Sequence, residues 1–356
     1  MLIMGSPRIS FSISARGPAA ILLALFVVSR LVALESAQAW AGEGVAIIDT
    51  HVHMIRSLKR GSPDAPAALR IMDAFRVEMA IILPPPFPGG HPGIYGRREL
   101  EPIAREYPGR FAFVAGGETL NPIVHRTAPE AVTPDIIREF RREAEIIVNA
   151  GAAGFGELTA EHFSSGRGNH PYESTRPDHP LFLVLADIAA RHGMPIDLHM
   201  EAVPRDMPTP ERYARGANPN SLKENISAFE RLLAHNRDAR IVWAHAGWDL
   251  TGERTVPLMR AMLSRHPNLY MSVKLDSRGP QLTSALDPNG TIRSGWLALL
   301  KDFPDRFLIG SDQFYDDGTE RLARVRKFVD QLPADVANLV GRENARRVYR
   351  LGKPAK

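Results

Sequence analysis

The sequence contains no cysteine among its 356 residues. This absence excludes disulfide bonds, thiolate metal ligands, a cysteine nucleophile and a lipid-modified cysteine. Any metal that the protein binds must therefore be held by imidazole and carboxylate groups, which suit several divalent ions.

Blocks of like charge are also missing. The formal net charge is only +4, from 44 basic and 40 acidic residues, and the basic side chains form no cluster of the kind that binds a phosphate backbone. We therefore expect no nucleic-acid partner and interpret the chain as a soluble enzyme that acts on a small molecule. The sequence leaves a homo-oligomer open.

Long apolar runs are confined to the N-terminal region. Basic residues precede an apolar stretch from Ala19 to Val28, and Ala37-Gln38-Ala39 offers a cleavage point. We expect residues 1–41 to be a secretory leader and residues 42–356 to be one catalytic domain, exported to the periplasm or secreted. Arg30 interrupts the apolar stretch, so the alternatives are an uncleaved anchor or a start codon placed too early, which would leave the enzyme in the cytoplasm. After cleavage we expect no stable insertion in a membrane.

Strand-like and helix-like runs alternate through the rest of the chain. The expected strands cover residues 45–49, 79–83, 111–115, 154–157, 195–199, 240–245, 269–275 and 307–312. The expected helices cover residues 66–76, 97–106, 134–149, 181–192, 222–235, 256–265, 296–302, 320–331 and 333–350. This alternation predicts an α/β fold, a (β/α)8 TIM barrel. A doubly wound open sheet is the alternative, but no glycine-rich phosphate loop follows the first strand.

Five of these strands end at side chains that can bind a metal. The residues are His51, His53, Glu157, His199, His245 and Asp312. Barrel strands deliver their C-terminal residues to one rim, and residues two apart on a strand face the same way, so the six side chains can converge. A single residue of this kind is more often a core histidine, a surface histidine or a helix cap. His199, His245 and Asp312, which end separate apolar runs, carry more weight than the His51-x-His53 spacing.

Four motifs contain most of these residues. They are Ile48-Asp49-Thr50-His51-Val52-His53, Pro195-Ile196-Asp197-Leu198-His199, Val242-Trp243-Ala244-His245-Ala246-Gly247 and Leu308-Ile309-Gly310-Ser311-Asp312. Together they resemble the amidohydrolase superfamily, most closely its amidohydrolase-related branch of metal-dependent hydrolases and decarboxylases, from about residue 45 to residue 350. The resemblance implies that His51 and His53 bind a first metal and that His199 and His245 add ligands. It also implies that Asp312 binds metal and carries protons.

The fourth strand separates members of this superfamily. Many place a carboxylated lysine there to bridge two metals, some place a glutamate, and single-metal members need neither. The resemblance therefore implies that Glu157 bridges two metals, whereas the alternative is a glutamate that pairs with an arginine or touches substrate. With one metal, His51, His53, His199 and Asp312 would hold the ion while His245 orients water.

The expected reaction follows from metal chemistry. A bound divalent ion lowers the pKa of water to about 7 and polarises a carbonyl group. We expect a hydrolase that attacks an amide, lactone or ester, with Asp312 and His245 as its catalytic residues and with one or two ions. Zinc is the expected metal, with manganese and iron as alternatives. The other hypotheses are a non-oxidative decarboxylase of an aromatic or unsaturated acid and, outside enzymology, a secreted binding protein on a worn barrel.

Substrate recognition has weaker signals. Lys274 and Arg278 lie at and after the seventh strand, where they could hold a substrate carboxylate, although each could equally be a solvated surface cation. Glu201 could face the same site, and Trp248 could line it or pack against its own helix. We expect the histidines of the long fourth loop, which are His162, His170 and His179, to face solvent.

Overall fold

The computed structural model describes residues 44–54, 64–86, 95–164, 171–277, 282–315 and 318–352. The expected leader, Arg278 and His170 lie outside these residues.

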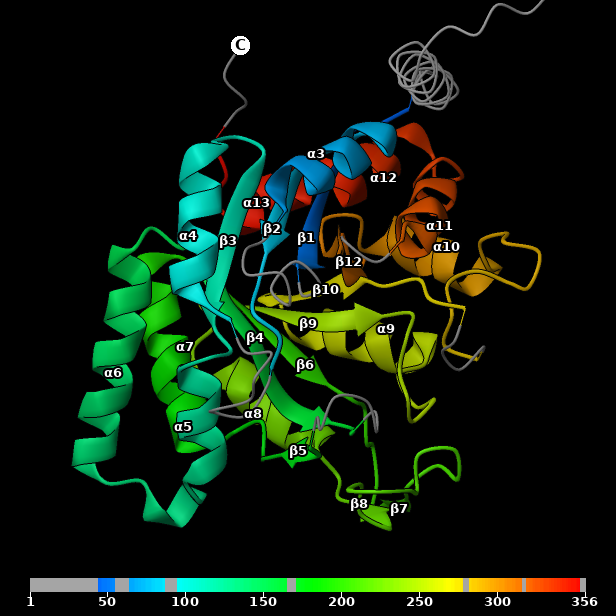
Figure 1. Ribbon diagram of the computed structural model, residues 1–356. Helices are drawn as coiled ribbons and strands as arrows, with labels where there is room; N and C mark the ends of the chain where they lie inside the picture. The colour runs from blue at the N-terminus through cyan, green and yellow to red at the C-terminus, as the bar shows by residue number, and fades with distance from the viewer. Residues whose placement is uncertain are drawn as a thin grey trace, which may run out of the picture. The chain divides into compact units, whose positions relative to one another are not determined.

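Eight parallel strands run in sequence order around a closed sheet (Figure 1). They are β1 (Ile47–His53), β2 (Val77–Ile82), β3 (Phe111–Gly116), β4 (Gly154–His162), β6 (Pro195–Met200), β9 (Arg240–Ala246), β10 (Leu269–Val273) and β11 (Phe307–Ile309). The pairing of Asp49 in β1 with Ile309 in β11 closes the ring. The predicted TIM barrel is therefore confirmed, and the open doubly wound sheet is excluded.

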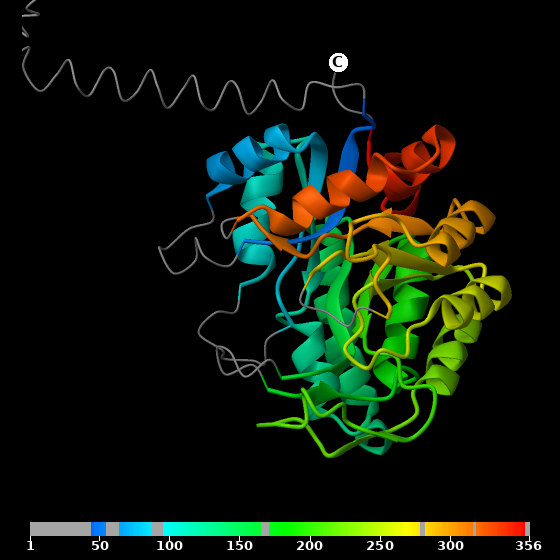
Figure 2. The same ribbon diagram turned by 90° about the vertical axis from the view of Figure 1, so that its right-hand side faces the viewer.

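Helices follow most of the barrel strands and surround the sheet (Figure 2). They are α3 (Ala65–Ala74), α4 (Arg97–Glu106), α5 (Leu120–Arg126), α6 (Pro134–Asn149), α7 (Pro180–His192), α8 (Ile226–His235), α9 (Val256–Arg265), α10 (Ser294–Asp302), α11 (Glu320–Val329), α12 (Ala334–Asn338) and α13 (Asn344–Val348), with the short turns η1 (Pro129–Ala131) and η2 (Leu339–Glu343). Local signals set several boundaries. The hydroxyl of Thr133 accepts the N–H of Ile136 at the start of α6, and Gly193, at φ 61°, ends α7.

The structure differs from expectation at several places. The helix α5 was not expected, and the strand expected at 307–312 ends at Ile309 and is followed by the short strand β12 (Gln313–Phe314). The strand expected at 154–157 continues to His162, because its end pairs with the short antiparallel strand β5 (Glu173–Ser174). The helix expected from residue 222 begins at Ile226, because Ser221 and Leu222 form β8 and pair with β7 (Met207–Pro208). The single helix expected at 333–350 is divided by the π-helical turn η2 into α12 and α13. The added strands β5, β7 and β8 all lie in loops that follow the C-terminal ends of β4 and β6.

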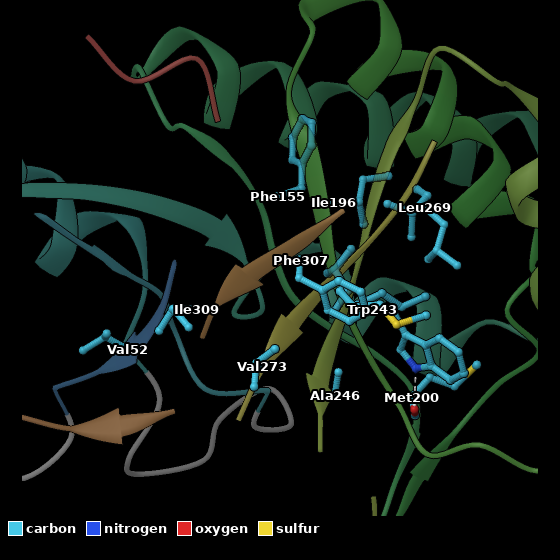
Figure 3. Packing of buried hydrophobic residues seen from close by; sticks show 14 of the residues in the cluster. Val52, Phe155, Ile196, Met200, Trp243, Ala246, Leu269, Val273, Phe307 and Ile309 are labelled. Atoms are coloured by element: carbon cyan, nitrogen blue, oxygen red, sulfur yellow. Dashed lines mark hydrogen bonds between the residues drawn. The ribbon is translucent and has the colours of Figure 1, made fainter. Parts of the chain in front are cut away.

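Alternate residues of the strands pack on opposite faces of the sheet. Ile241 and Trp243 belong to the large cluster that includes buried helix residues such as Phe140, whereas Val242 belongs to a smaller cluster with Ile48. The large cluster therefore fills the space between sheet and helices, and part of it is shown in Figure 3. Within the described part of the chain, no helix is long and apolar enough to span a membrane.

Candidate metal centre

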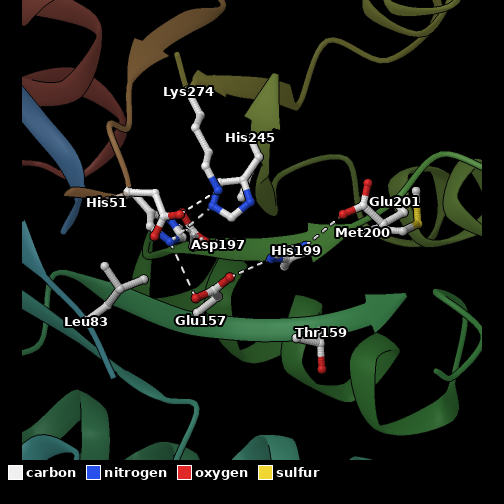
Figure 4. A network of polar contacts seen from close by, with 12 residues as sticks. His51, Leu83, Glu157, Thr159, Asp197, His199, Met200, Glu201, His245 and Lys274 are labelled. Atoms are coloured by element: carbon white, nitrogen blue, oxygen red, sulfur yellow. Dashed lines mark hydrogen bonds and ion pairs between the residues drawn. The ribbon is translucent and has the colours of Figure 1, made fainter. Parts of the chain in front are cut away.

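All six residues that the sequence nominates as ligands converge at the C-terminal side of the barrel. Each is buried, and Figure 4 shows four of them on their strands. The six are His51 and His53 on β1, Glu157 on β4, His199 on β6, His245 on β9, and Asp312 in the turn between β11 and β12 (Gln313–Phe314). The sequence predicted that these side chains would meet at one rim of the barrel, and the structure brings them together there.

The two histidines of β1 both turn Nε2 toward the cluster, and Nδ1 of each ring faces away from it. Nδ1 of His51 lies 3.2 and 3.3 Å from the two carboxylate oxygens of Asp197. Nδ1 of His53 lies 3.1 Å from the carbonyl oxygen of Leu83, an acceptor that requires an N–H on that nitrogen. A neutral ring that keeps its proton on Nδ1 offers the lone pair of Nε2, which is the form that binds a metal.

Glu157 divides its two carboxylate oxygens between different histidines. Oε2 lies 3.4 Å from Nε2 of His51 and 3.4 Å from Nε2 of His53. Oε1 lies 2.7 Å from Nδ1 of His199 on the other side. The carboxylate therefore stands between the β1 histidines and the β6 histidine.

His245 and Asp312 complete the cluster. Nε2 of His245 lies 3.4 Å from Nε2 of His51, and Oδ1 of Asp312 lies 3.2 Å from Nε2 of His53. Both residues have left-handed backbone angles, with φ of 69° and 52°, a conformation that costs free energy for residues other than glycine and is concentrated at functional sites. Within the described residues, buried Nδ1 of His245 has no hydrogen-bond partner.

These atoms fit a divalent cation. Two overlapping groups each bring three ligand atoms within 4.8 Å of one another: His51, Glu157 and His245, and His51, His53 and Asp312. Ring nitrogens here face each other and face carboxylate oxygens, and every one of these groups is buried. A positive ion among them would compensate for the burial of all these groups. His199 is outside both groups, although it contacts Glu157.

The electrostatics of the site favour positive charge. Burial would lower the pKa of His51, but the charges of Asp197 and Glu157 outweigh it and raise that pKa well above its ordinary value. Burial likewise would raise the pKa of Glu157, but His51 and hydrogen bonds from the neighbouring histidines hold it well below the usual range. Glu157 thus remains ionised and attracts a cation, as metal binding requires.

The comparison with protein families agrees with this geometry. A family model described as Amidohydrolase matches residues 48–351. The chain belongs to the amidohydrolase family. The resemblance stated from the four motifs is thereby confirmed, and two overlapping groups of residues within the cluster could hold a divalent metal ion.

Solved structures resemble this family member at low identity. They include a 2,6-dihydroxybenzoate decarboxylase (15% identity, TM-score 0.49, covering 86% of this chain and 100% of the other). A 5-carboxyvanillate decarboxylase from Novosphingobium aromaticivorans, complexed with manganese, has 14% identity and a TM-score of 0.46, covering 86% and 97%. A uronate isomerase from Bacillus halodurans has 12% identity and a TM-score of 0.51, covering 83% and 71%. A search of curated proteins finds no match. These similarities extend to the fold alone.

Lys274, one of the two expected substrate-binding residues, lies against the cluster of candidate metal ligands. Its Nζ is 2.5 Å from Oδ2 of Asp312 and 3.3 Å from the ring centroid of Trp248. The side chain is buried rather than solvated, and burial lowers the pKa of Lys274 although Asp312 opposes this shift. Trp248 therefore faces the site.

Two further residues of the site were missed by the sequence analysis. Asp197, which contacts His51, stands two residues before His199 on β6, and strand alternation could have identified it because both side chains point inward. Arg321 lies on α11, beyond the last barrel strand, with Nη1 3.0 Å from Oδ2 of Asp312 and Nε 2.9 Å from Oδ2 of Asp276. No local pattern distinguishes Arg321 from the other arginines of that helix.

The remaining expectations have mixed outcomes. Glu201 does face the cluster, since Oε1 lies 3.3 Å from Nε2 of His199. The expectation that His179 faces solvent is wrong: it is buried, its Nδ1 accepts the N–H of Leu181 at the start of α7, and its Nε2 lies 2.8 Å from the carbonyl oxygen of Thr127. His162 is half-buried, and its ring centroid is 4.4 Å from that of His199.

Proposed function

We propose that this chain is a metal-dependent hydrolase that cleaves an amide, lactone or ester bond in a small carboxylated molecule. The observation that carries the proposal is the position of Glu157, whose oxygens face the β1 histidines and His199 separately. A carboxylate in this position suits two neighbouring cations, and paired cations are typical of hydrolytic sites.

The proposed ligand sets follow from the contacts. His51, His53 and Asp312 would hold one cation. His199 and His245, whose ring centroids are 4.5 Å apart, would hold the second, with Glu157 shared between them. A divalent cation bound there supplies polarisation of a carbonyl group and a lower pKa for water. We propose zinc as the cation, with manganese or iron as alternatives, because the ligands are imidazole and carboxylate only.

The chain's own groups supply proton transfer and substrate binding. Oδ1 of Asp312 faces the cluster while Oδ2 is occupied by Lys274 and Arg321. Asp312 would accept the proton of the attacking water through Oδ1 and return it to the leaving group. If the site holds a single cation, His245 would orient the water instead of binding metal. Lys274 would hold the substrate carboxylate, a role that we also propose for Arg278.

Decarboxylation of an aromatic or unsaturated acid is the second candidate reaction. Two decarboxylases of aromatic acids are among the similar solved structures named above. Within this chain, decarboxylation is favoured by two positively charged side chains, Lys274 and Arg321. Both face one oxygen of Asp312, next to the candidate metal ligands. Such a pair would hold a substrate carboxylate beside the metal.

Metal analysis and product analysis together test the proposal. The purified chain should contain two equivalents of metal and hydrolyse members of a panel of carboxylated esters, lactones and amides. One equivalent, with carbon dioxide released from aromatic acids and no hydrolysis, would establish decarboxylation instead. A chain that binds no metal would overturn both reactions.

The N-terminal region carries a separate proposal. We propose that residues 1–41 direct export and are removed, so that the mature enzyme works in the periplasm or outside the cell. N-terminal sequencing of the protein recovered from cell fractions tests this, since an intact leader on a cytoplasmic product would refute it.

A further inference from the structure

Arg254 is a buried, positively charged residue beside the candidate metal ligands. The proposed reaction assigns it no role. It lies in the segment between β9 and α9 and is 1% exposed. Its Nη2 donates to the carbonyl oxygen of Met200 at 2.6 Å, and its Nη1 donates to the carbonyl oxygen of Ala244. Met200 directly follows His199, and Ala244 directly precedes His245. One guanidinium thus joins the two strands at the residues next to their histidines.

Trp243 strengthens this connection. The guanidinium carbon of Arg254 lies 3.9 Å from the centroid of the Trp243 ring. Nε1 of Trp243 donates to the same carbonyl oxygen of Met200 at 2.7 Å, a bond drawn in Figure 3. The Met200 carbonyl therefore receives two donors, and the guanidinium lies over an aromatic face, an arrangement that lysine cannot reproduce.

The segment that carries Arg254 also fixes the ring of His199. Asp249, which is fully buried, accepts the backbone N–H groups of Ala202 and Arg254, each at 3.0 Å. The N–H of Leu250 donates to Oε2 of Glu201 at 2.6 Å, and the other oxygen of Glu201 lies 3.3 Å from Nε2 of His199. The segment after β9 therefore holds the backbone after β6 and also the carboxylate that orients the His199 ring.

We infer that Arg254 is a positioning residue that sets His199 and His245 in place for one of the two proposed cations. This inference rests on the proposed function, because it concerns the second ligand set. Partners that orient a metal-binding histidine typically affect metal affinity by about 10- to 100-fold. Arg254 does not contact the histidine rings themselves. It would act through its hydrogen bonds to the backbone carbonyl groups of the residues next to each histidine.

The test compares Arg254→Met with Arg326→Met by titrating metal-free protein with zinc or manganese. Arg326 is a matched control: it is also 1% exposed and also donates to a backbone carbonyl, that of Val45 at 2.7 Å, but just before the N-terminal end of β1. We expect Arg254→Met to lower the affinity for one of two cations by about 10-fold or more and to leave the other unchanged. Arg326→Met should lower only the melting temperature.

The outcomes separate this inference from the function on which it rests. Wild-type protein without metal would overturn the proposed function and this inference with it. Two cations bound equally by wild type and Arg254→Met would overturn the inference alone. If Arg254→Met does not fold, Arg254→Lys decides the question, because lysine keeps the charge but lacks the planar fork that lies over Trp243 and meets both carbonyl groups: weaker binding of one cation supports the positioning role, and unchanged binding refutes it.

Discussion

The carboxylate of Asp197 lies 3.2 Å from Nδ1 of His51, so that ring turns Nε2 toward Glu157. The two residues are far apart in sequence, yet both are fully buried at the barrel mouth. A carboxylate behind a metal-binding histidine fixes the tautomer and raises the basicity of the ring.

Replacing Asp197 with asparagine should weaken metal binding. Asparagine keeps the shape of the side chain but removes the negative charge, so metal affinity should fall about 10- to 100-fold while the fold persists. Isothermal titration of metal-free protein measures the change. Asp187→Asn is a matched control, because Asp187 also pairs with a histidine, His235, at 3.2 Å, but on partly exposed helices. Equal losses in both variants would contradict the role of Asp197.

The proposed bridging role of Glu157 can be tested by counting cations. Glu157→Gln should reduce metal content from two equivalents to one, because the amide removes the charge that faces both histidine sets. Glu173→Gln is the control: Glu173 is also buried, but its carboxylate bonds Asn121 at 3.3 Å and Thr159 at 3.2 Å rather than a histidine. Elemental analysis should give two equivalents in the control. Two equivalents in Glu157→Gln as well would refute the bridging role.

The features that the sequence predicted are those governed by local pattern and barrel topology. His199 and His245 could be placed at one rim because each ends an apolar run, and parallel strands bring such ends together. Asp197 was within reach of the same rule, since it shares a face of its strand with His199.

Other features depend on contacts between distant segments. Arg321 meets Asp312 only because α11 returns to the barrel mouth, and nothing around Arg321 in the sequence indicates that contact. The extension of β4 to His162 requires pairing with Glu173 and Ser174 of a later loop. His179 is buried because its ring caps α7 and meets the backbone of Thr127, a partner 52 residues away. Local propensity contains none of this information.

Asp312 is the residue for which we expect the largest loss of turnover. Lys274 and Arg321 hold the pKa of Asp312 well below its ordinary value, although burial alone would raise it. Asp312→Asn removes the proposed metal ligand and proton acceptor, so kcat should fall by about 100- to 10,000-fold with circular dichroism unchanged. Asp302→Asn, which removes an exposed partner of Arg260, should retain full turnover. Turnover retained by Asp312→Asn would exclude it from the reaction.

Glu173 should make stability depend on pH in a way that one substitution removes. Burial raises the pKa of Glu173 to about 7, from the ordinary value of 4.5. Between these two values the folded chain holds a proton that the unfolded chain has released, so the free energy of unfolding falls as pH rises from about 4.5 to about 7. Over that window the loss is on the order of 3 kcal/mol.

The glutamine in Glu173→Gln does not ionise, so the free energy of unfolding of this variant should not show that decrease with pH. Urea unfolding of metal-free protein at pH 5 and pH 8 measures it, because the free-energy difference between variant and wild type isolates Glu173 from other titrating groups. The variant should gain stability relative to wild type at the higher pH. A difference that is the same at both pH values would mean that Glu173 ionises in the folded protein as it does in the unfolded chain, and that Asn121 and Thr159 fully compensate for its burial.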